Sequence, residues 1–197
     1  MFCISACSGV IDIIFVLDSS GSEQSQRFQI IQQVVVDVIQ QLEISFDRTR
    51  VGLVYFSDLA ILDFNLLAFP VKQDLIEAIK RVPYIGGKTN TADAISLLYT
   101  NAFTQANGDR QEAPNIAIIF TDGGSNINRN ETIYEGVQAK IRGTRLMVAG
   151  IGDYVNLQEV TQIGSDPVNR NVFTTPWNYN KTIIDQLVNG TCNGRWN

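Results

Sequence analysis

The sequence predicts an α/β domain with a doubly wound, mostly parallel sheet, one antiparallel edge strand and helices on both faces. Three observations lead to this fold class. Apolar segments of strand length recur along the chain, stretches with helical periodicity separate most of them, and one pair of strand-like segments is joined by a very short link. The length of 197 residues suits one compact domain, and 45% hydrophobic with 18% charged residues is ordinary for a folded protein.

Four segments are almost continuously apolar, which is typical of strands buried on both faces in a parallel sheet. They comprise residues 11–17, 51–56, 115–120 and 145–151. A fifth segment, residues 60–66, follows the second after only three residues. Because so short a link cannot make the crossover that parallel strands require, we expect an antiparallel edge hairpin at this point.

Six stretches show the three- and four-residue spacing of apolar side chains that predicts amphipathic helices. In the clearest of them, Phe28, Ile31, Val35, Val38 and Leu42 share one face, and Gln and Asp fill the other. The predicted helices comprise residues 24–42, 73–81, 91–103, 132–142, 157–163 and 177–188. The order of the predicted strands and helices leaves room for one more short strand before the last helix. Strands and helices then alternate as they do in a doubly wound domain.

Charge and composition exclude several classes of function. Fifteen Lys and Arg residues against 20 Asp and Glu residues give a net charge of −5, and histidine is absent. An acidic chain lacks the positive field that general nucleic-acid binding requires, so no nucleic-acid partner is expected. The absence of histidine excludes Ser-His-Asp and Cys-His catalysis and His-ligated zinc or haem. No apolar run reaches the roughly 18 residues of a membrane span, so no span is expected in this chain.

The three cysteines lie near the two ends of the chain, where a disulfide could join them. Cys3, Cys7 and Cys192 form no Cys-x-x-Cys pattern, so a metal cluster or redox pair is not expected. A bridge between Cys7 and Cys192 would join the two ends of one domain and restrict the unfolded chain by roughly 4–5 kcal/mol in the entropy model. Two free thiols in a reducing compartment are the alternative. We expect an N-terminal extension over residues 1–9 (a signal remnant or simply the start of the chain), the domain over 10–192 and a tail over 193–197.

Three Asn-x-Thr sequons, at Asn130, Asn180 and Asn189, are candidate glycosylation sites. Roughly two such matches are expected by chance in a chain of this composition, so the sequons agree with secretion without establishing it.

Oxygen-bearing side chains follow the predicted strands at one edge of the sheet. Asp18, Ser20 and Ser22 come after the first strand, and Asp122 follows the strand at 115–120. Thr89 lies before a helix, in a glycine-containing segment that can fold onto the same edge. In open α/β sheets, ligands bind beyond the carboxyl ends of the strands. Two carboxylates and three hydroxyls form the all-oxygen set that hard divalent cations prefer, so the sequence predicts bound Mg²⁺, with Mn²⁺ or Ca²⁺ as alternatives.

Helix capping is the alternative use of these side chains. The run from Ser20 to Glu23 fits a capping box before the first helix. Asn90 or Thr91 could cap the helix that starts there, and Asp122 could accept hydrogen bonds from loop amides. Convergence of all these residues on one predicted edge favours the metal, because capping requires no convergence.

The arrangement resembles the metal-ion-dependent adhesion site of von Willebrand factor type A domains. The resemblance has three parts in chain order, Asp18-x-Ser20-x-Ser22, Thr89 and Thr121-Asp122-Gly123. Similarity extends over nearly the whole chain, from the first apolar segment to the last helix. The family includes integrin inserted domains and the matrix-type domains of collagen VI, matrilins and invertebrate shell or byssal proteins.

The resemblance implies a role for each of these residues. Ser20 and Ser22 would bind the cation directly, Thr89 directly or through water, and Asp18 and Asp122 largely through bridging waters. The cation would keep an open position that a Glu or Asp carboxylate of a partner can fill. The family pattern often has glycine where this chain has Ala92.

From the resemblance we expect a secreted adhesion module of the extracellular matrix, with no enzymatic activity. It would bind an acidic group of a protein partner such as collagen through the cation. The alternative is a structural matrix domain whose metal only braces loops and whose binding lies elsewhere. An enzyme using Asp18 as phosphoryl acceptor usually has a second Asp two residues later, where Ser20 stands here. Lys88 and Arg129 flank the predicted site and could steer an acidic partner, with solvated loop charges as the alternative.

Overall fold

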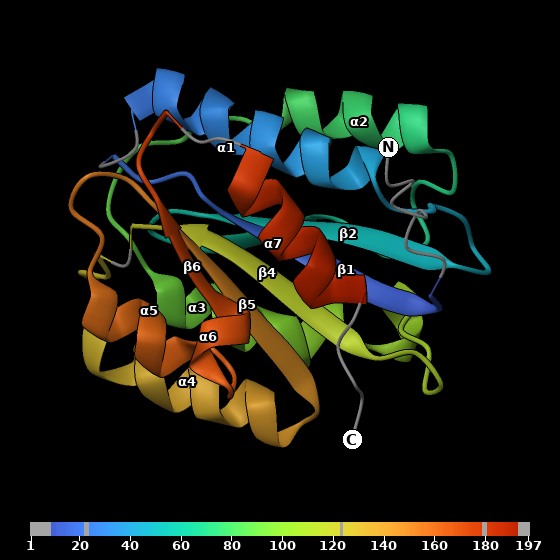
Figure 1. Cartoon of the computed structure of the whole chain (residues 1–197). Helices are drawn as coiled ribbons and strands as arrows, with labels where there is room; N and C mark the ends of the chain where they lie inside the picture. Colours follow the sequence, from blue (N-terminus) through green and yellow to red (C-terminus); the bar gives the residue numbers. More distant parts are fainter. Residues whose placement is uncertain (1–8, 22–23, 123, 179–180, 193–197) are drawn as a thin grey trace.

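A six-stranded sheet with the order β3-β2-β1-β4-β5-β6 forms the centre of the computed structural model (Figure 1). The structure describes residues 9–21, 24–122, 124–178 and 181–192. The strands are β1 (Ile11–Asp18), β2 (Thr49–Phe56), β3 (Ala60–Phe64), β4 (Asn115–Thr121), β5 (Thr144–Ile151) and β6 (Val172–Thr175). All neighbours are parallel except β2 and β3. The predicted fold class, including the antiparallel edge hairpin, is confirmed, and β6 is the additional short strand.

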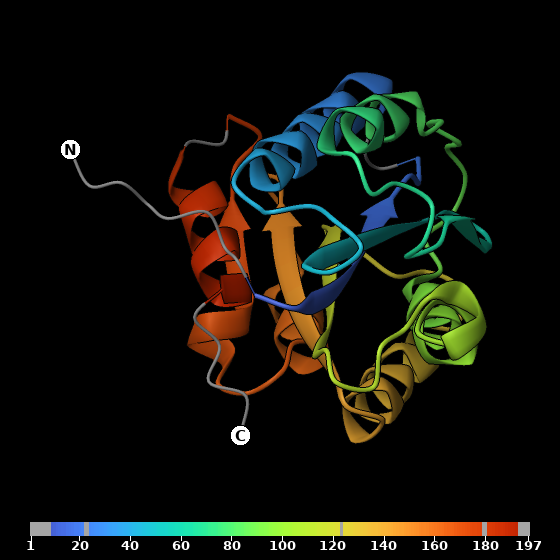
Figure 2. The ribbon, with the colours of Figure 1, turned by 90° about the vertical axis from the view of Figure 1, so that its right-hand side faces the viewer.

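Helices cover both faces of the sheet. One layer consists of α1 (Gln24–Gln40), α2 (Lys72–Arg81) and α7 (Lys181–Cys192), and the other of α3 (Thr91–Leu97), α4 (Arg129–Ile141) and α5 (Leu157–Ile163). A short helix, α6 (Val168–Asn171), leads into β6. In Figure 2, α1 and α2 lie above the strands and α3 and α4 below them. None of the helices in the described part of the chain combines the length and apolarity that crossing a bilayer requires.

Burial on both faces explains why the strands are continuously apolar. In β1, Ile13, Phe15 and Leu17 pack under α1, α2 and α7, whereas Ile14 and Val16 face the layer of α3, α4 and α5. All five side chains are fully buried. A strand with alternating polarity could not fill both layers, so the pattern that predicted a parallel sheet follows from its position between two helical layers.

The last helix occupies a different range from the predicted 177–188. It is described from Lys181, and Trp177 lies outside it, where the guanidinium of Arg27 lies 4.8 Å from its ring centroid. It continues to Cys192 because Thr191 is buried in the final turn and donates to the carbonyl four residues earlier at 2.8 Å. Apolar spacing alone could not distinguish a tryptophan packed from a loop from one on a helix.

The helix predicted over 91–103 is divided in the structure. Its α-helical part ends at Leu97, and a π-helical turn (Leu98–Ala102) follows, closed by a 2.8 Å hydrogen bond from the Phe103 amide to the Leu98 carbonyl. The apolar positions stay buried through the change of helix type, which is why the periodicity appeared continuous. The other predicted elements agree with the observed ones to within a few residues at each end.

Candidate metal site

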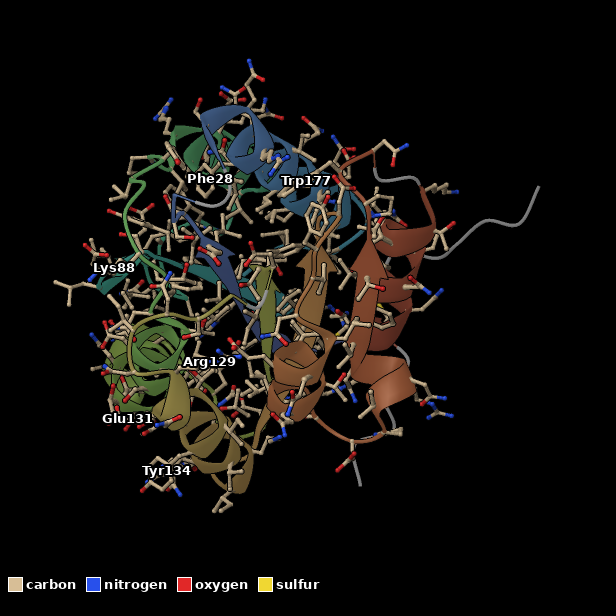
Figure 3. All side chains as sticks on the ribbon, turned by 90° about the vertical axis from the view of Figure 1, so that its left-hand side faces the viewer. Phe28, Lys88, Arg129, Glu131, Tyr134 and Trp177 are labelled. Atoms are coloured by element: carbon tan, nitrogen blue, oxygen red, sulfur yellow. The ribbon has the colours of Figure 1, made fainter. Side chains whose placement is uncertain are left out.

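The carboxyl ends of β1 and β4 lie side by side and bring the first two site segments together. The register pairs Leu17 with Phe120, so Asp18 and Thr121 are the next residues on neighbouring strands. The Thr121 hydroxyl donates to Oδ2 of Asp18 at 2.8 Å. Figure 3 views the molecule from the side on which the flanking residues Lys88 and Arg129 are exposed.

Asp18 is fully buried at this edge. Its Oδ1 accepts a 3.0 Å hydrogen bond from the Ser20 amide, and the Ser20 hydroxyl also bonds to this carboxylate. Burial raises the pKa of Asp18 to about 6, although hydrogen bonds from Ser20 and Thr121 lower it and the Asp122 charge raises it further. Among the residues that the structure describes, no Lys or Arg pairs with Asp18. The edge therefore holds a buried negative charge that a cation would offset.

The segment before α3 brings Thr89 to the same edge. The Gly86 amide donates to the Ser19 carbonyl at 2.8 Å, and the Gly21 amide donates to the Gly87 carbonyl at 2.9 Å. A Cβ atom at Gly21 would lie 2.9 Å from that carbonyl oxygen, so this close approach requires glycine. Two loops far apart in sequence are thereby joined backbone to backbone.

The joined loops place hydroxyl groups in contact. The Thr89 hydroxyl donates to the Ser20 hydroxyl oxygen at 2.9 Å, and both residues are buried. Since Ser20 also bonds to Asp18, the three side chains form one hydrogen-bonded chain of oxygens. The structure thus brings together three of the five predicted site residues.

Asp122 lies next to this chain, at the end of β4. It is half-buried, and its Oδ1 accepts from the Gly124 amide at 2.9 Å. Its charge acts on both Asp18 and Glu159, raising the pKa of each. Asp122 therefore accepts a loop amide, as the capping alternative expects, and also adds negative charge to the edge of the sheet that holds Asp18.

Asn90 is the residue that caps α3. Its side-chain oxygen accepts from the Asp93 amide at 3.3 Å, and its Nδ2 donates to the Asp58 carbonyl at 3.0 Å. The neighbouring Thr89 is not needed as a cap, and its hydroxyl points to Ser20 instead. Adjacent residues thus have different contacts here, Asn90 as the helix cap and Thr89 as part of the candidate metal site.

Asn90→Ala is expected to lower the free energy of unfolding by about 1 kcal/mol, because it removes this cap and the link to Asp58. Urea unfolding measures the change. Asn169→Ala is the matched control, because Asn169 is exposed on α6, and we expect it to change stability by less than about 0.5 kcal/mol. Equal losses in both variants would contradict the capping role.

Asn126 supports the site although no pattern in the sequence points to it. Its side-chain oxygen accepts from the Thr89 amide at 3.0 Å, and its own amide donates to the Thr89 carbonyl at 3.0 Å. Both backbone groups of Thr89 are therefore held by the loop after β4. No motif predicts such a contact, because it depends on how two loops meet.

Glu159 is a second supporting residue that was missed. It is 6% exposed, its Oε1 accepts from the Ser125 amide at 3.3 Å, and burial raises its pKa. The sequence did contain a signal, because Asn156 stands three residues earlier and caps α5 by accepting from the Glu159 amide at 3.2 Å. That pattern indicates a helix start, and only the fold shows that the carboxylate faces the loop after β4.

The other predicted residues are placed as follows. Ser22 and Cys7 lie outside the described residues, so the role of Ser22 as a ligand stays a prediction. Cys192, in the last turn of α7, is bonded in a disulfide. Its pairing with Cys7 stays a prediction as well.

Two sequons lie in described helices. Asn130 is exposed in the first turn of α4, and Asn189 is exposed on α7. Asn180 lies outside the described residues. Glycosylation of all three sites stays a prediction.

The donor set fits a hard divalent cation. Every side chain gathered at the edge offers oxygen, from the hydroxyls of Ser20 and Thr89 and the carboxylates of Asp18 and Asp122. Within the described ranges, no group of three or more His, Cys, Asp or Glu side chains is arranged to hold a metal. The hydroxyl groups gathered here are oxygen donors, which suit Mg²⁺ better than a soft metal.

Comparison with known proteins gives consistent results. Residues 12–186 match the family model of the von Willebrand factor type A domain. Matrilin-1 of Gallus gallus is 33% identical over 175 residues, covering 87% of this chain and 35% of matrilin-1. The collagen alpha-4(VI) chain of Mus musculus is 32% identical over 182 residues, covering 91% of this chain and 8% of the collagen chain. The chain thus spans about a third or less of these relatives.

A solved structure matches nearly the whole fold. It is proximal thread matrix protein 1 from the mussel byssus, with a zinc-occupied MIDAS motif, where MIDAS denotes the metal-ion-dependent adhesion site. The TM-score is 0.87 at 25% sequence identity, with 94% of this chain and 49% of that chain covered.

Proposed function

The chain belongs to the von Willebrand factor type A domain family, and we propose that it is an extracellular adhesion module that binds an acidic partner through a divalent cation. The observation that carries the proposal is the hydrogen-bonded chain of oxygens from Asp18, Ser20 and Thr89 at the carboxyl edge of the sheet. Mg²⁺ is the proposed cation. The zinc-occupied site of the mussel protein supports a divalent cation at this edge.

Each residue has a defined part in this proposal. Ser20, Ser22 and Thr89 supply neutral oxygens, and Asp18 and Asp122 supply the negative charge that offsets the cation. The cation provides a positive centre for a carboxylate of the partner. The buried contacts of Ser20 and Thr89 keep their oxygens in place before the cation arrives, which lowers the cost of ordering the site.

The partner we propose is a matrix protein such as collagen that presents a Glu or Asp side chain. Lys88 and Arg129 are exposed on the same side of the molecule (Figure 3). Their charges favour the approach of an acidic group to a domain whose net charge is −5.

An extracellular location agrees with the relatives, which include matrilins and a collagen VI chain. The disulfide at Cys192 supports the same location, because disulfides persist in oxidising environments. We propose residues 10–192 as the domain, with 1–9 as an extension and 193–197 as a tail.

The test is binding of the domain to immobilised collagen with 1 mM Mg²⁺ or with excess chelator. We expect binding in Mg²⁺ and at least about tenfold weaker binding in chelator, because the carboxylate contact requires the cation. Collagen whose carboxylates have been amidated is the matched control, and it should bind weakly in both conditions.

A structural role in the matrix is the second candidate, favoured by the likeness to a thread matrix protein. In that case the cation only braces the loops at the sheet edge. Binding that persists in chelator, together with a lower melting temperature on chelation, would support this candidate over adhesion through the metal.

A further inference from the structure

A second concave site lies at the opposite end of the sheet from Asp18. A pocket of about 400 Å³ opens beside the first residues of β5, between the end of α4 and the segment that contains α6. A strand of eight residues separates the two ends by roughly 25 Å. Three cationic side chains line the pocket, Lys140, Arg145 and Arg170, with a single carboxylate from Asp166.

Two hydrogen bonds orient the guanidinium of Arg145. Its Nε donates to the side-chain oxygen of Asn171 at 2.6 Å, and its Nη1 donates to the Gly190 carbonyl at 2.8 Å. Asn171 is itself 1% exposed and donates to the carbonyls of Ser165 and Pro167. The position of Arg145 at the wall of the pocket is thus set by a buried asparagine.

Lys140 is oriented in a similar way from the other wall. Its ammonium donates to the carbonyls of Gln162 and Gly164 at 3.2 Å and 3.1 Å. Arg170 is exposed at the mouth of the pocket. The three cations come from α4, β5 and α6, so only the folded chain brings them together.

The electrostatics of the pocket favour an anion. Burial lowers the pKa of Arg145, and the nearby charge of Arg170 lowers it further. Burial also lowers the pKa of Lys140, while Asp166 opposes the change. The hydrogen bonds to Asn171, to Gly190 and to the carbonyls at the end of α5 explain the positions of Arg145 and Lys140 one at a time. They do not explain why both meet Arg170 in one hollow of a protein whose net charge is −5.

We propose that this pocket binds a sulfate group of an extracellular glycan. A tetrahedral oxyanion suits the fork of an arginine together with the point charge of a lysine. The choice of sulfate over phosphate rests on the extracellular location proposed above, where sulfate esters are the abundant oxyanions carried by polymers. With the metal site at the other end, the domain would join an acidic protein to a sulfated glycan.

The experiment measures binding of a sulfated heparin octasaccharide, and of the same octasaccharide after desulfation, by titration calorimetry at physiological salt. We expect the sulfated form to bind the domain and the desulfated form to bind at least about tenfold more weakly. The affinity should be the same in chelator as in Mg²⁺. That independence separates this site from the metal site, so failure of one proposal leaves the other standing.

Arg170→Gln is the main variant, because Arg170 is exposed, and it should weaken sulfated-octasaccharide binding at least about tenfold. Lys80→Gln on α2 removes the same charge away from the pocket and should leave the affinity unchanged. Lys140→Gln, with its fold checked by circular dichroism, should also weaken binding. Equal affinity for both octasaccharides, no binding of either, or equal effects of Arg170→Gln and Lys80→Gln would overturn the proposal.

Discussion

Asp122→Ala is expected to weaken Mg²⁺ binding strongly while leaving the fold intact. Its carboxylate is half-buried and holds one loop amide, that of Gly124, so truncation costs little stability. The metal edge, however, loses one of the two carboxylates whose charge offsets the cation. We expect the Mg²⁺ affinity to fall about 100-fold or more, measured by titration calorimetry with Mg²⁺ and again with Mn²⁺.

Asp153→Ala is the matched control for this prediction. Asp153 is exposed in the loop after β5, at the same end of the sheet, so the variant removes an equal charge without touching the oxygen chain. Its Mg²⁺ affinity should stay within about threefold of the parent protein, as expected for a screened surface charge. The proposed site is wrong if both variants bind Mg²⁺ equally well.

Asp18→Asn should have two opposite effects, loss of Mg²⁺ binding and a more stable metal-free domain. The shift of the Asp18 pKa from 3.8 to about 6 corresponds to a cost of up to about 3 kcal/mol for keeping the buried carboxylate ionised at neutral pH. The amide of asparagine fills the same space without that charge. Urea unfolding in chelator at pH 7.5 should therefore show a gain of roughly 1–3 kcal/mol.

The pH dependence gives this prediction a second check. The folded pKa lies above the unfolded value, so the penalty in the parent protein is complete above about pH 6 and disappears below about pH 4. The advantage of Asp18→Asn in chelator should shrink as the pH falls from 7.5 to 5. Saturating Mg²⁺ should reverse the order at pH 7.5, because it stabilises only the parent protein. A variant that is less stable than the parent in chelator at pH 7.5 would contradict the account.

The secondary structure was predicted closely wherever the apolar side chains of a segment followed a single pattern. Strands buried on both faces are apolar throughout, so their pattern is unambiguous. The three-residue link before Ala60 is too short for a helical crossover and therefore predicted an antiparallel pair. The predictions failed at the bounds of helices. Trp177 has the spacing of a helical residue, yet it packs against Arg27 from a loop, and the helix starts at Lys181.

The gathering of Asp18 and Asp122 at one edge was predictable for a topological reason. Carboxyl ends of parallel strands meet at one edge, and β1 and β4 are neighbouring strands, so the residues that follow them lie close although they are far apart in sequence. Thr89 reaches the same edge because the segment before α3 bonds to the loop after β1. The contributions of Asn126 and Glu159 were not predictable, because they depend on which loop backbone each side chain reaches.

The sequence by itself determined the sheet, its antiparallel edge and the edge at which oxygen atoms collect, because these depend on patterns that repeat within one element. Only the tertiary structure decided which distant charges meet. Asp12, polar within an apolar strand, is fully buried because Arg110 pairs with it at 2.6 Å from 98 residues away. Lys140, Arg145 and Arg170 likewise share one pocket although no motif connects them. Contacts of this kind depend on the packing of whole elements, which no local pattern encodes.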